Sequence, residues 1–247
     1  MVTRRAPPPR PGPCRLCPVR PLALFRPVSE AELDAIATAR TTVRLLRAGE
    51  AVLRRGEGAD VVLTLFAGWA FAYRVLPDGR RQIGEIFLPG DLIGARGAAS
   101  DPVEAVTDAS VCVLSRARLR AMLDAHPALA VSFAQLVARA NALLAERLAS
   151  LGRRDAAQRV GALMLELAAR QNAGRPPKDE DVAMPLRQAQ LGDALGLSAE
   201  HVNRALASLR RDRLLTLRAR TLRLHDPDRL ARLCGWDPAY LADPPAL

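Results

Sequence analysis

The residues with the clearest chemical potential lie in the stretch LGDALGLSAEHVNRALASL, residues 191–209. At helical spacing, Glu200, Asn203 and Arg204 fall on a face away from the apolar positions. An arginine can pair with guanine through two hydrogen bonds, a glutamate can accept one from cytosine, and an asparagine can pair with adenine. The spacing therefore predicts a surface that reads the edges of DNA base pairs.

Two short helices with a turn between them must position these side chains. Gly196 interrupts the apolar periodicity, Ser198 is suited to cap the second helix, and the small residues Gly192 and Ala194 allow close crossing. The second helix carries an apolar stripe at i, i+3, i+4 and i+7, formed by Val202, Ala205, Leu206 and Leu209. This pattern predicts a helix-turn-helix. The alternative is an ordinary helical hairpin whose polar face is solvated.

The segment LLTLRARTLRLHD, residues 214–226, predicts a β-hairpin wing beside the second helix, with Arg218 and Arg220 at its tip. Arginines at such a tip are suited to contact phosphates. The direction of the His201 side chain stays open. The residues predicted to contact DNA are Ser198, Ala199, Glu200, His201, Asn203, Arg204, Arg218 and Arg220.

The charge of the chain agrees with a polyanionic partner. The 247 residues carry a formal net charge of +10 and a pI of about 10.9. From Arg187 to Arg223 there are eight arginines and three acidic residues, a net charge of +5. A chain of this length can form one large domain or two modest ones.

Other classes of protein find little support in the sequence. We expect no transmembrane helix, because no run of about 20 consecutive apolar residues occurs, and no secretory signal, because the basic N-terminus continues into a proline-rich stretch. No Ser/His/Asp grouping, phosphate-binding loop or GxGxxG motif is present, so we expect no enzymatic activity. The four cysteines do not resemble a disulfide framework, which favours the cytoplasm.

The first half of the chain has the sequence pattern of a small β-domain. Residues 1–13 are rich in Pro and Arg and are expected to be disordered. Residues 30–39 predict a short helix. Strand-like runs separated by Gly and Pro turns follow at 42–46, 52–55, 61–66, 69–76, 81–88 and 109–114. This spacing predicts an antiparallel sandwich or barrel.

A long helix is predicted over 128–151, after a short one at 116–124. It carries two apolar stripes, of which one can pack on the barrel and the other on a copy of itself, so a homodimer is expected. The alternative is a core helix of a monomer. The residues assigned to dimerisation are Leu129, Phe133, Leu136, Val137, Ala140, Leu144, Leu148 and Leu151.

The order of these elements resembles the Crp/Fnr family of bacterial transcription regulators. The resemblance covers roughly residues 14–240 and is carried by LPDGRRQI (76–83), LPGDLIG (88–94), LGRRDAAQRVGALML (151–165) and PLRQAQLGDALGLSAEHVNRAL (185–206). It implies an α+β fold: an N-terminal antiparallel β-barrel or jelly roll like that of cyclic-nucleotide-binding domains, a long dimerisation helix, and a C-terminal winged helix-turn-helix. The expected divisions are a basic tail (1–27), a sensor barrel (28–125), the dimerisation helix (126–152) and the DNA-binding domain (153–247).

The resemblance also implies partners and a target. Glu200 and Arg204 match the family positions that read a TTGA- or TGA-type half-site, and we expect an inverted repeat close to TTGA-N6-TCAA. The expected partners are double-stranded DNA, a second copy of the chain and RNA polymerase, and no membrane. Two alternatives remain: a metal or redox protein whose C-terminal domain binds other proteins, and a cyclic-nucleotide-responsive version of the same regulator.

The identity of an effector stays open. Pro102 and Val103 occupy the positions of the Arg-Ser pair that binds the cyclic phosphate in the cyclic-nucleotide branch, which argues against cyclic AMP. Cys14, Cys17 and Cys112 match three of the four positions that hold an iron–sulfur cluster in Fnr proteins, and Ala23 stands at the fourth. These thiols leave a cluster, a Zn²⁺ site, a thiol–disulfide switch and no cofactor at all as interpretations.

Overall fold

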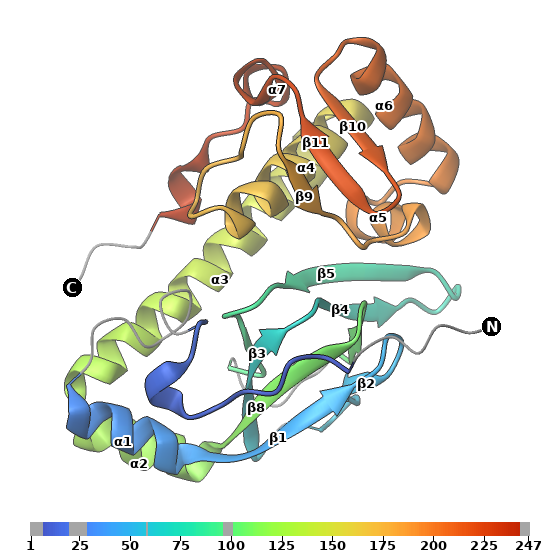
Figure 1. The fold of residues 1–247 in the computed structure, drawn as a ribbon. Helices are drawn as coiled ribbons and strands as arrows, with labels where there is room; N and C mark the ends of the chain where they lie inside the picture. The colour runs from blue at the N-terminus through green and yellow to red at the C-terminus, as the bar shows by residue number, and fades with distance from the viewer. Residues whose placement is uncertain (1–6, 20–28, 58, 96–100, 243–247) are drawn as a thin grey trace. The chain divides into compact units, whose positions relative to one another are not determined.

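The computed structural model describes residues 7–19, 29–57, 59–95 and 101–242 (Figure 1). The chain divides into two compact units. One is formed by the residues up to Tyr73 together with Ile86–Ala138, and the other by Arg74–Glu85 and Arg139–Pro244.

The β-domain is built on two antiparallel sheets, with strand orders β1-β8-β3-β6 and β2-β7-β4-β5. Its strands belong to the first unit, except for the end of β4 and most of β5. The expected antiparallel barrel or sandwich is therefore confirmed. The strands are β1 (Arg40–Leu46), β2 (Ala51–Leu53), β3 (Val61–Ala67), β4 (Ala70–Val75), β5 (Arg81–Phe87), β6 (Leu92–Ile93), β7 (Val103–Ala105) and β8 (Ala109–Ser115).

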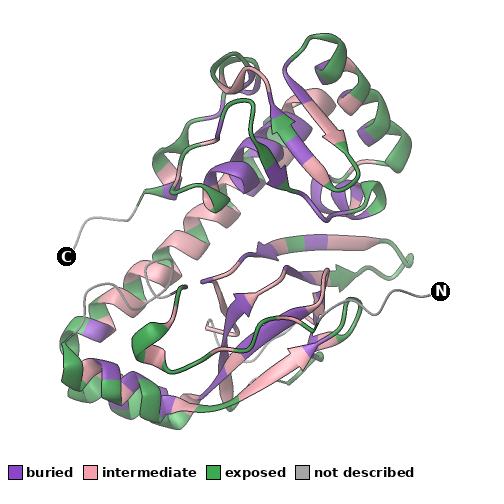
Figure 2. Ribbon diagram, viewed as in Figure 1, coloured by how far each residue is buried: buried purple, intermediate pink, exposed green. Residues whose placement is uncertain are grey.

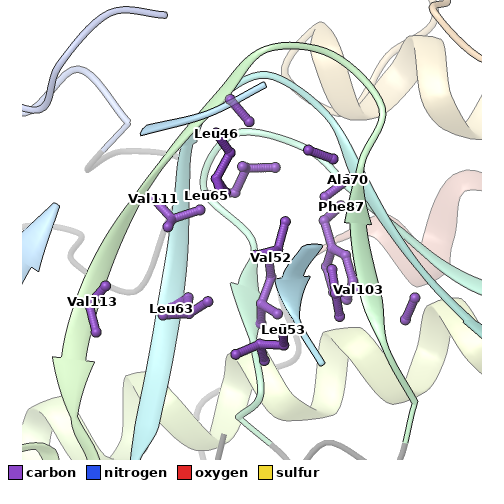
Figure 3. Packing of buried hydrophobic residues seen from close by; sticks show 14 residues of the cluster. Leu46, Val52, Leu53, Leu63, Leu65, Ala70, Phe87, Val103, Val111 and Val113 are labelled. Carbon is purple, nitrogen blue, oxygen red and sulfur yellow. The ribbon is translucent and has the colours of Figure 1, made fainter. Parts of the chain in front are cut away.

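Apolar side chains from both sheets fill the interior between them (Figure 3). Leu63 and Leu65 of β3 and Val111 and Val113 of β8 point inward and are buried. Because side chains alternate along a strand, Thr64 and Cys112, which are paired in the register of β3 and β8, face the opposite side of that sheet.

Helices cover this opposite side. α1 (Glu30–Ala39) begins at the N-cap Ser29, whose side chain and that of Glu32 form a capping box. Together with α2 (Arg116–Ala125) and the first turns of α3 (Pro127–Arg153), it forms a second apolar cluster. The fully buried members of this cluster are Ile36, Ala39, Val62, Leu114, Leu119, Met122 and Leu129.

The second unit is assembled around α4 (Ala156–Gln171), which begins at the N-cap Asp155 and is buried from Val160 to Ala169. α6 (Ala199–Arg211) and α7 (Pro227–Cys234) pack against it. The other elements are α5 (Gln188–Leu195), the antiparallel sheet β10-β11-β9 with β9 (Asp181–Ala183), β10 (Leu215–Arg218) and β11 (Thr221–Leu224), and a final short helix, η3 (Pro238–Leu241).

Three short strands differ from the sequence-based expectations. β6, β7 and β9 have two or three residues each, too few to show an alternating pattern, and they exist because a longer partner strand supplies their hydrogen bonds. Residues 7–13, expected to be disordered, are placed against the β-domain: the Ser110 hydroxyl donates to the Pro9 carbonyl (2.8 Å), and Arg40 donates to the Gly12 carbonyl (2.9 Å).

Among the described helices, α3 is long and apolar enough to span a membrane by length and composition alone, although polar residues such as Gln135 and Arg139 interrupt its apolar sequence. Almost none of its most apolar stretch is buried within the single chain.

Candidate DNA-binding site

The polar face of α6 is positioned by an apolar stripe on its opposite side. Val202, Ala205 and Leu209 are buried in the second unit, and Leu206 is half-buried. This packing turns Glu200, Asn203 and Arg204 outward, and all three are exposed. The outer face of α6 is accordingly drawn largely in green in Figure 2. The side chains that could pair with bases are therefore presented to the outside on a rigid helix.

The turn before α6 depends on two glycines. Gly196 ends α5 in the left-handed conformation (φ 63°, ψ 36°), which costs glycine little. A Cβ at Gly192 would lie 2.5 Å from the carbonyl oxygen of Leu197, so only glycine permits this approach. The expected helix-turn-helix is thus confirmed, and its close crossing occurs between α5 and the turn.

Ser198 caps α6. Its hydroxyl oxygen accepts the backbone N–H of His201 (3.2 Å) and lies 2.8 Å from Nδ1 of the same residue. The structure therefore gives the Ser198 hydroxyl a capping role. Both side chains are exposed, as is Ala199 at the first helical position.

The wing is a two-residue hairpin between β10 and β11. Arg218 pairs with Thr221, and the two residues between them, Ala219 and Arg220, have positive φ values of 49° and 63°. Arg218 and Arg220 are exposed at this tip, as predicted from the sequence.

The base of the wing is tied to the loop that follows α4. Arg223 of β11 pairs with Asp181 of β9 (2.8 Å), and this guanidinium lowers the pKa of the Asp181 carboxyl. His225 joins Thr216 (Nε2 to Oγ1, 2.9 Å) to Asp179 (Nδ1 to Oδ1, 3.1 Å). His225 therefore has a structural role at the base of the wing.

Further exposed arginines extend the basic surface of this unit. Arg210 and Arg211 form the last turn of α6, and Arg213 follows it with a φ of 55°. They were not among the predicted contacts because they lie outside the polar face of the first turns. The run RRDR at 210–213 was the available signal.

Neither Pro102 nor Val103, at the two positions that bind the cyclic phosphate in the cyclic-nucleotide branch, has a cationic side chain. Val103 is buried in β7, and the Pro102 carbonyl accepts the backbone N–H of Tyr73 (3.1 Å). These residues do not fit a cyclic nucleotide phosphate.

Two of the three cysteines that match the Fnr pattern, Cys14 and Cys112, are both influenced by the charge of Arg40, although they are far apart in sequence. Cys14 begins the short helix η1 (Cys14–Leu16), Cys17 follows it, and Cys112 lies on β8. Burial raises the pKa of the Cys112 thiol, Arg40 opposes this through a hydrogen bond and its charge, and the Cys17 and Cys14 thiols raise it further.

This set of thiols does not fit a four-thiolate cluster. Within the described part of the chain, no three His, Cys, Asp or Glu side chains gather closely enough to hold one metal ion. The remaining cysteine, Cys234, belongs to the second unit, where it is buried in α7 against Gly161. Ala23, at the fourth family position, lies outside the described residues.

The predicted dimerisation residues fall into two groups. Leu129 is 1% exposed and packs in the cluster with α1 and α2, so it is not available to a second chain. Phe133 is partly buried and packs against the same cluster. Farther along α3, Leu148 is 73% exposed. The others are half-buried: Leu136, Val137, Ala140, Leu144 and Leu151.

Known proteins match both halves of the chain. The family model of the Crp-like helix-turn-helix domain matches residues 158–233, and that of the cyclic nucleotide-binding domain matches residues 43–126. The chain is 29% identical over 221 residues to the transcriptional activatory protein AadR of Rhodopseudomonas palustris, covering 89% of this chain and 92% of that protein. It is also 29% identical over 196 residues to the nitrogen fixation regulation protein FixK of Rhizobium meliloti, covering 78% of this chain and 87% of that one.

Among solved structures, FixK2 from Bradyrhizobium japonicum superimposes with a TM-score of 0.71 at 30% identity, covering 78% of this chain and 96% of that chain. The matches cover the β-domain, the long helix and the winged helix-turn-helix in the same order. The chain therefore belongs to the Crp/Fnr family of DNA-binding transcription regulators.

Proposed function

We propose that this protein is a homodimeric regulator that reads an inverted repeat through α6 and is controlled through its β-domain. The observation that carries the proposal is the arrangement of α6: its apolar stripe is buried, whereas Glu200, Asn203 and Arg204 are exposed beside two exposed wing arginines. A helical hairpin without a ligand has no need of this combination of base-reading and phosphate-binding side chains.

The apolar face of α3 is the proposed dimer interface, where it would pack against α3 of a second copy of the chain. Its apolar side chains are exposed or half-buried in the single chain, and burying them against another α3 would stabilise a dimer. The second half of the helix is held by charged groups: Glu146 pairs with Arg154 (2.5 Å), and Arg147 pairs with Glu166 (3.1 Å). Such pairs suit a protein environment rather than a bilayer, so we assign the protein to the cytoplasm and propose no membrane contact.

The resemblance to Fnr proteins suggests the target. Arg204 would pair with guanine, and Glu200 would accept a hydrogen bond from cytosine, in half-sites of the TTGA type. A dimer places two recognition helices one turn of DNA apart, about 34 Å, so the half-sites should form TTGA-N6-TCAA. Arg218 and Arg220 would contact the adjacent phosphates.

In this proposal the chain consists of a tail and three functional segments. Residues 28–125 would form the sensor, 126–152 the dimerisation helix and 153–247 the DNA-binding domain, with the tail at 1–27. RNA polymerase is the proposed further partner, because curated relatives such as AadR are described as transcriptional activators. Catalysis forms no part of the proposal.

The test is a titration of fluorescent DNA duplexes with purified protein. The wild type should bind TTGA-N6-TCAA at least about 100-fold more tightly than a scrambled duplex, and Arg204→Ala should remove most of this difference, since one bidentate pair contributes about 1–3 kcal/mol in each half-site. Arg120→Ala, an exposed arginine of α2, is the matched control for charge. Equal, weak binding to every duplex by the wild type would favour a protein-interaction role for the C-terminal domain.

A further inference from the structure

The second unit contains a small polar pocket where the last turns of α3 meet α4. The charged side chains that line it are Glu146 and Arg147 of α3, Arg154 just after this helix, and Arg159 and Glu166 of α4. All of them belong to the second unit. The space between them has room for about one water-sized particle. The pocket therefore lies where charged groups join the end of α3 to the helix around which this unit is built.

Arg147 carries an unused hydrogen-bond donor at this pocket. Its side chain is 10% exposed, and Nη2 donates to Oε1 of Glu166 (3.1 Å). Nη1 of the same guanidinium is buried and has no hydrogen-bond partner among the described residues. Because the two nitrogens share one rigid plane, Nη1 lies beside the contact with Glu166, which also lines the pocket. A buried donor of this kind costs free energy unless an acceptor from outside the chain takes the adjacent space.

Arg159 brings to the pocket a positive charge that no carboxylate offsets. Its guanidinium donates to the backbone carbonyls of Arg154 (2.8 Å) and Leu195 (3.2 Å), and among the described residues it forms no ion pair. Arg154, in contrast, pairs with Glu146 (2.5 Å). Carbonyl oxygens satisfy the N–H donors of Arg159 but carry no net charge, so an anion nearby would be stabilised.

The two carboxylates at the pocket are already engaged with other groups. Besides Arg147, the 3% exposed Glu166 contacts the guanidinium of Arg170 (3.5 Å) and accepts the Tyr240 hydroxyl (3.3 Å). Burial, and next the Glu166 carboxylate, raises the pKa of the Tyr240 phenol, which therefore stays a neutral donor. With Arg170 included, four guanidiniums meet two carboxylates, an excess of two positive charges. Such an excess calls for a counter-ion.

We propose that this pocket binds one chloride ion, which accepts a hydrogen bond from Nη1 of Arg147 and is attracted by the charge of Arg159. Ser150 also lines the pocket and is 5% exposed, and its hydroxyl is the further donor. A monatomic anion matches the available space, whereas sulfate and phosphate, with four oxygens around the central atom, exceed it. The proposal does not depend on DNA binding or on the identity of an effector.

The bound chloride would connect α3 to α4. Arg147 and Ser150 belong to the last two turns of α3, and Arg159 belongs to the first turn of α4. The unfolded chain does not hold these donors together, so chloride binds only the folded unit and stabilises it increasingly as its concentration rises.

Crystals of the full-length wild-type protein, grown with bromide in place of chloride, test the site directly. Bromide has the same charge and scatters anomalously, so an anomalous difference peak is expected within hydrogen-bond distance of Nη1 of Arg147. A water molecule at this place, with density but no anomalous signal, would overturn the proposal. A pocket without density would do the same.

Thermal unfolding followed by circular dichroism tests binding in solution. When sodium chloride replaces sodium gluconate at constant ionic strength, the wild-type midpoint should rise by about 2–4 °C along a saturating curve. Ser150→Ala leaves every ion pair in place and should need roughly fivefold more chloride for the same rise, because it lacks one hydrogen bond to the ion.

Arg147→Met should abolish the rise, because it removes the unused donor and its charge. The matched control is Arg153→Met, which removes an exposed arginine from the last turn of the same helix and should keep the wild-type response. Circular dichroism establishes that each variant is folded. If Arg147→Met does not fold, the Ser150→Ala titration and the bromide map still decide. No rise in the wild type, or an equal chloride response in the wild type and the folded pocket variants, would overturn the proposal.

Discussion

Gly192 of α5 lies against the carbonyl oxygen of Leu197 so closely that a methyl group at residue 192 would approach this oxygen to 2.5 Å. The Leu197 backbone N–H in turn donates to the Gly192 carbonyl (3.0 Å). This contact sets the path of the turn that leads to the exposed residues of α6.

Gly192→Ala should destabilise the second unit by about 1–3 kcal/mol, because the turn backbone must shift to accept a Cβ. Urea unfolding followed by circular dichroism measures the change. Gly152→Ala is the control, since Gly152 lies in a helix and a Cβ there meets nothing within 4 Å. Because alanine favours the helix by up to about 1 kcal/mol over glycine, this control should be neutral or stabilising. Equal stability of the two variants would contradict the assigned role of Gly192.

The double variant Arg218→Ala/Arg220→Ala should weaken binding to specific and scrambled duplexes alike, because phosphate contacts carry no sequence information. The slope of log K against log salt should become shallower by about 2 for each chain, since each phosphate that an arginine neutralises contributes roughly 0.9 to the slope. Fluorescence anisotropy at several salt concentrations measures both quantities. Arg55→Ala/Arg120→Ala removes the same charge from exposed positions of the β-domain and should leave the slope unchanged. A loss confined to the specific duplex would instead mean that the wing arginines read bases.

Leu148→Glu should convert the dimer into a monomer at micromolar concentration, because it places a charge on the exposed apolar face of α3. Light scattering coupled to size-exclusion chromatography reports the mass. The control is Leu233→Glu, the same substitution at a position of α7 that is 45% exposed. The Leu233→Glu protein should remain dimeric. A dimeric Leu148→Glu protein would exclude this face of α3 as the interface.

Glu166→Gln should cost about 3–5 kcal/mol of unfolding free energy. The Glu166 carboxylate is 3% exposed, accepts from Arg147 (3.1 Å), and lies 3.5 Å from Arg170, another deeply buried guanidinium. Removing its charge takes away the carboxylate that pairs with the buried Arg147, whose Nη1 already has no hydrogen-bond partner among the described residues. Asp124→Asn, in an exposed i,i+4 pair of α2 at 3.9 Å, is the comparison and should change stability by less than about 0.5 kcal/mol. Similar losses in both variants would show that burial of the Glu166 pair is energetically unimportant.

Cys234 should resist alkylation and disulfide reagents in the native protein at pH 8, because burial raises the pKa of its thiol to about 11. The unfolded chain ionises this thiol near its ordinary value of about 8.5, so its contribution to stability is complete below that pH and is lost as the pH rises toward 11. The variant in which the other three cysteines are Ser isolates this group. Ellman's reagent should label Cys234 slowly in native buffer and rapidly in urea. Rapid native labelling at pH 8 would contradict the burial.

The helix-turn-helix, the wing and the long helix could be predicted from the sequence, because local periodicity and turn residues define them. Gly196 and Ser198 mark the turn and the cap of α6, and a two-residue turn separates the wing strands. The β-domain could be predicted as a class, whereas β6 and β7 could not be placed. Strands of two or three residues carry no periodicity of their own and form only where a neighbouring strand provides hydrogen bonds.

The sequence by itself determined which face of α6 can meet DNA, since a helix with one apolar stripe has only one way to bury it. Tertiary structure decided what depends on distant segments. It buried Leu129 against α1 and α2 of the same chain, although this leucine continues the apolar stripe of α3. It also placed the backbone of Pro9 and Gly12 within hydrogen-bond distance of Ser110 and Arg40, respectively. Such proximity arises from how whole strands and an extended proline-rich segment pack together, and no local pattern of residues encodes it.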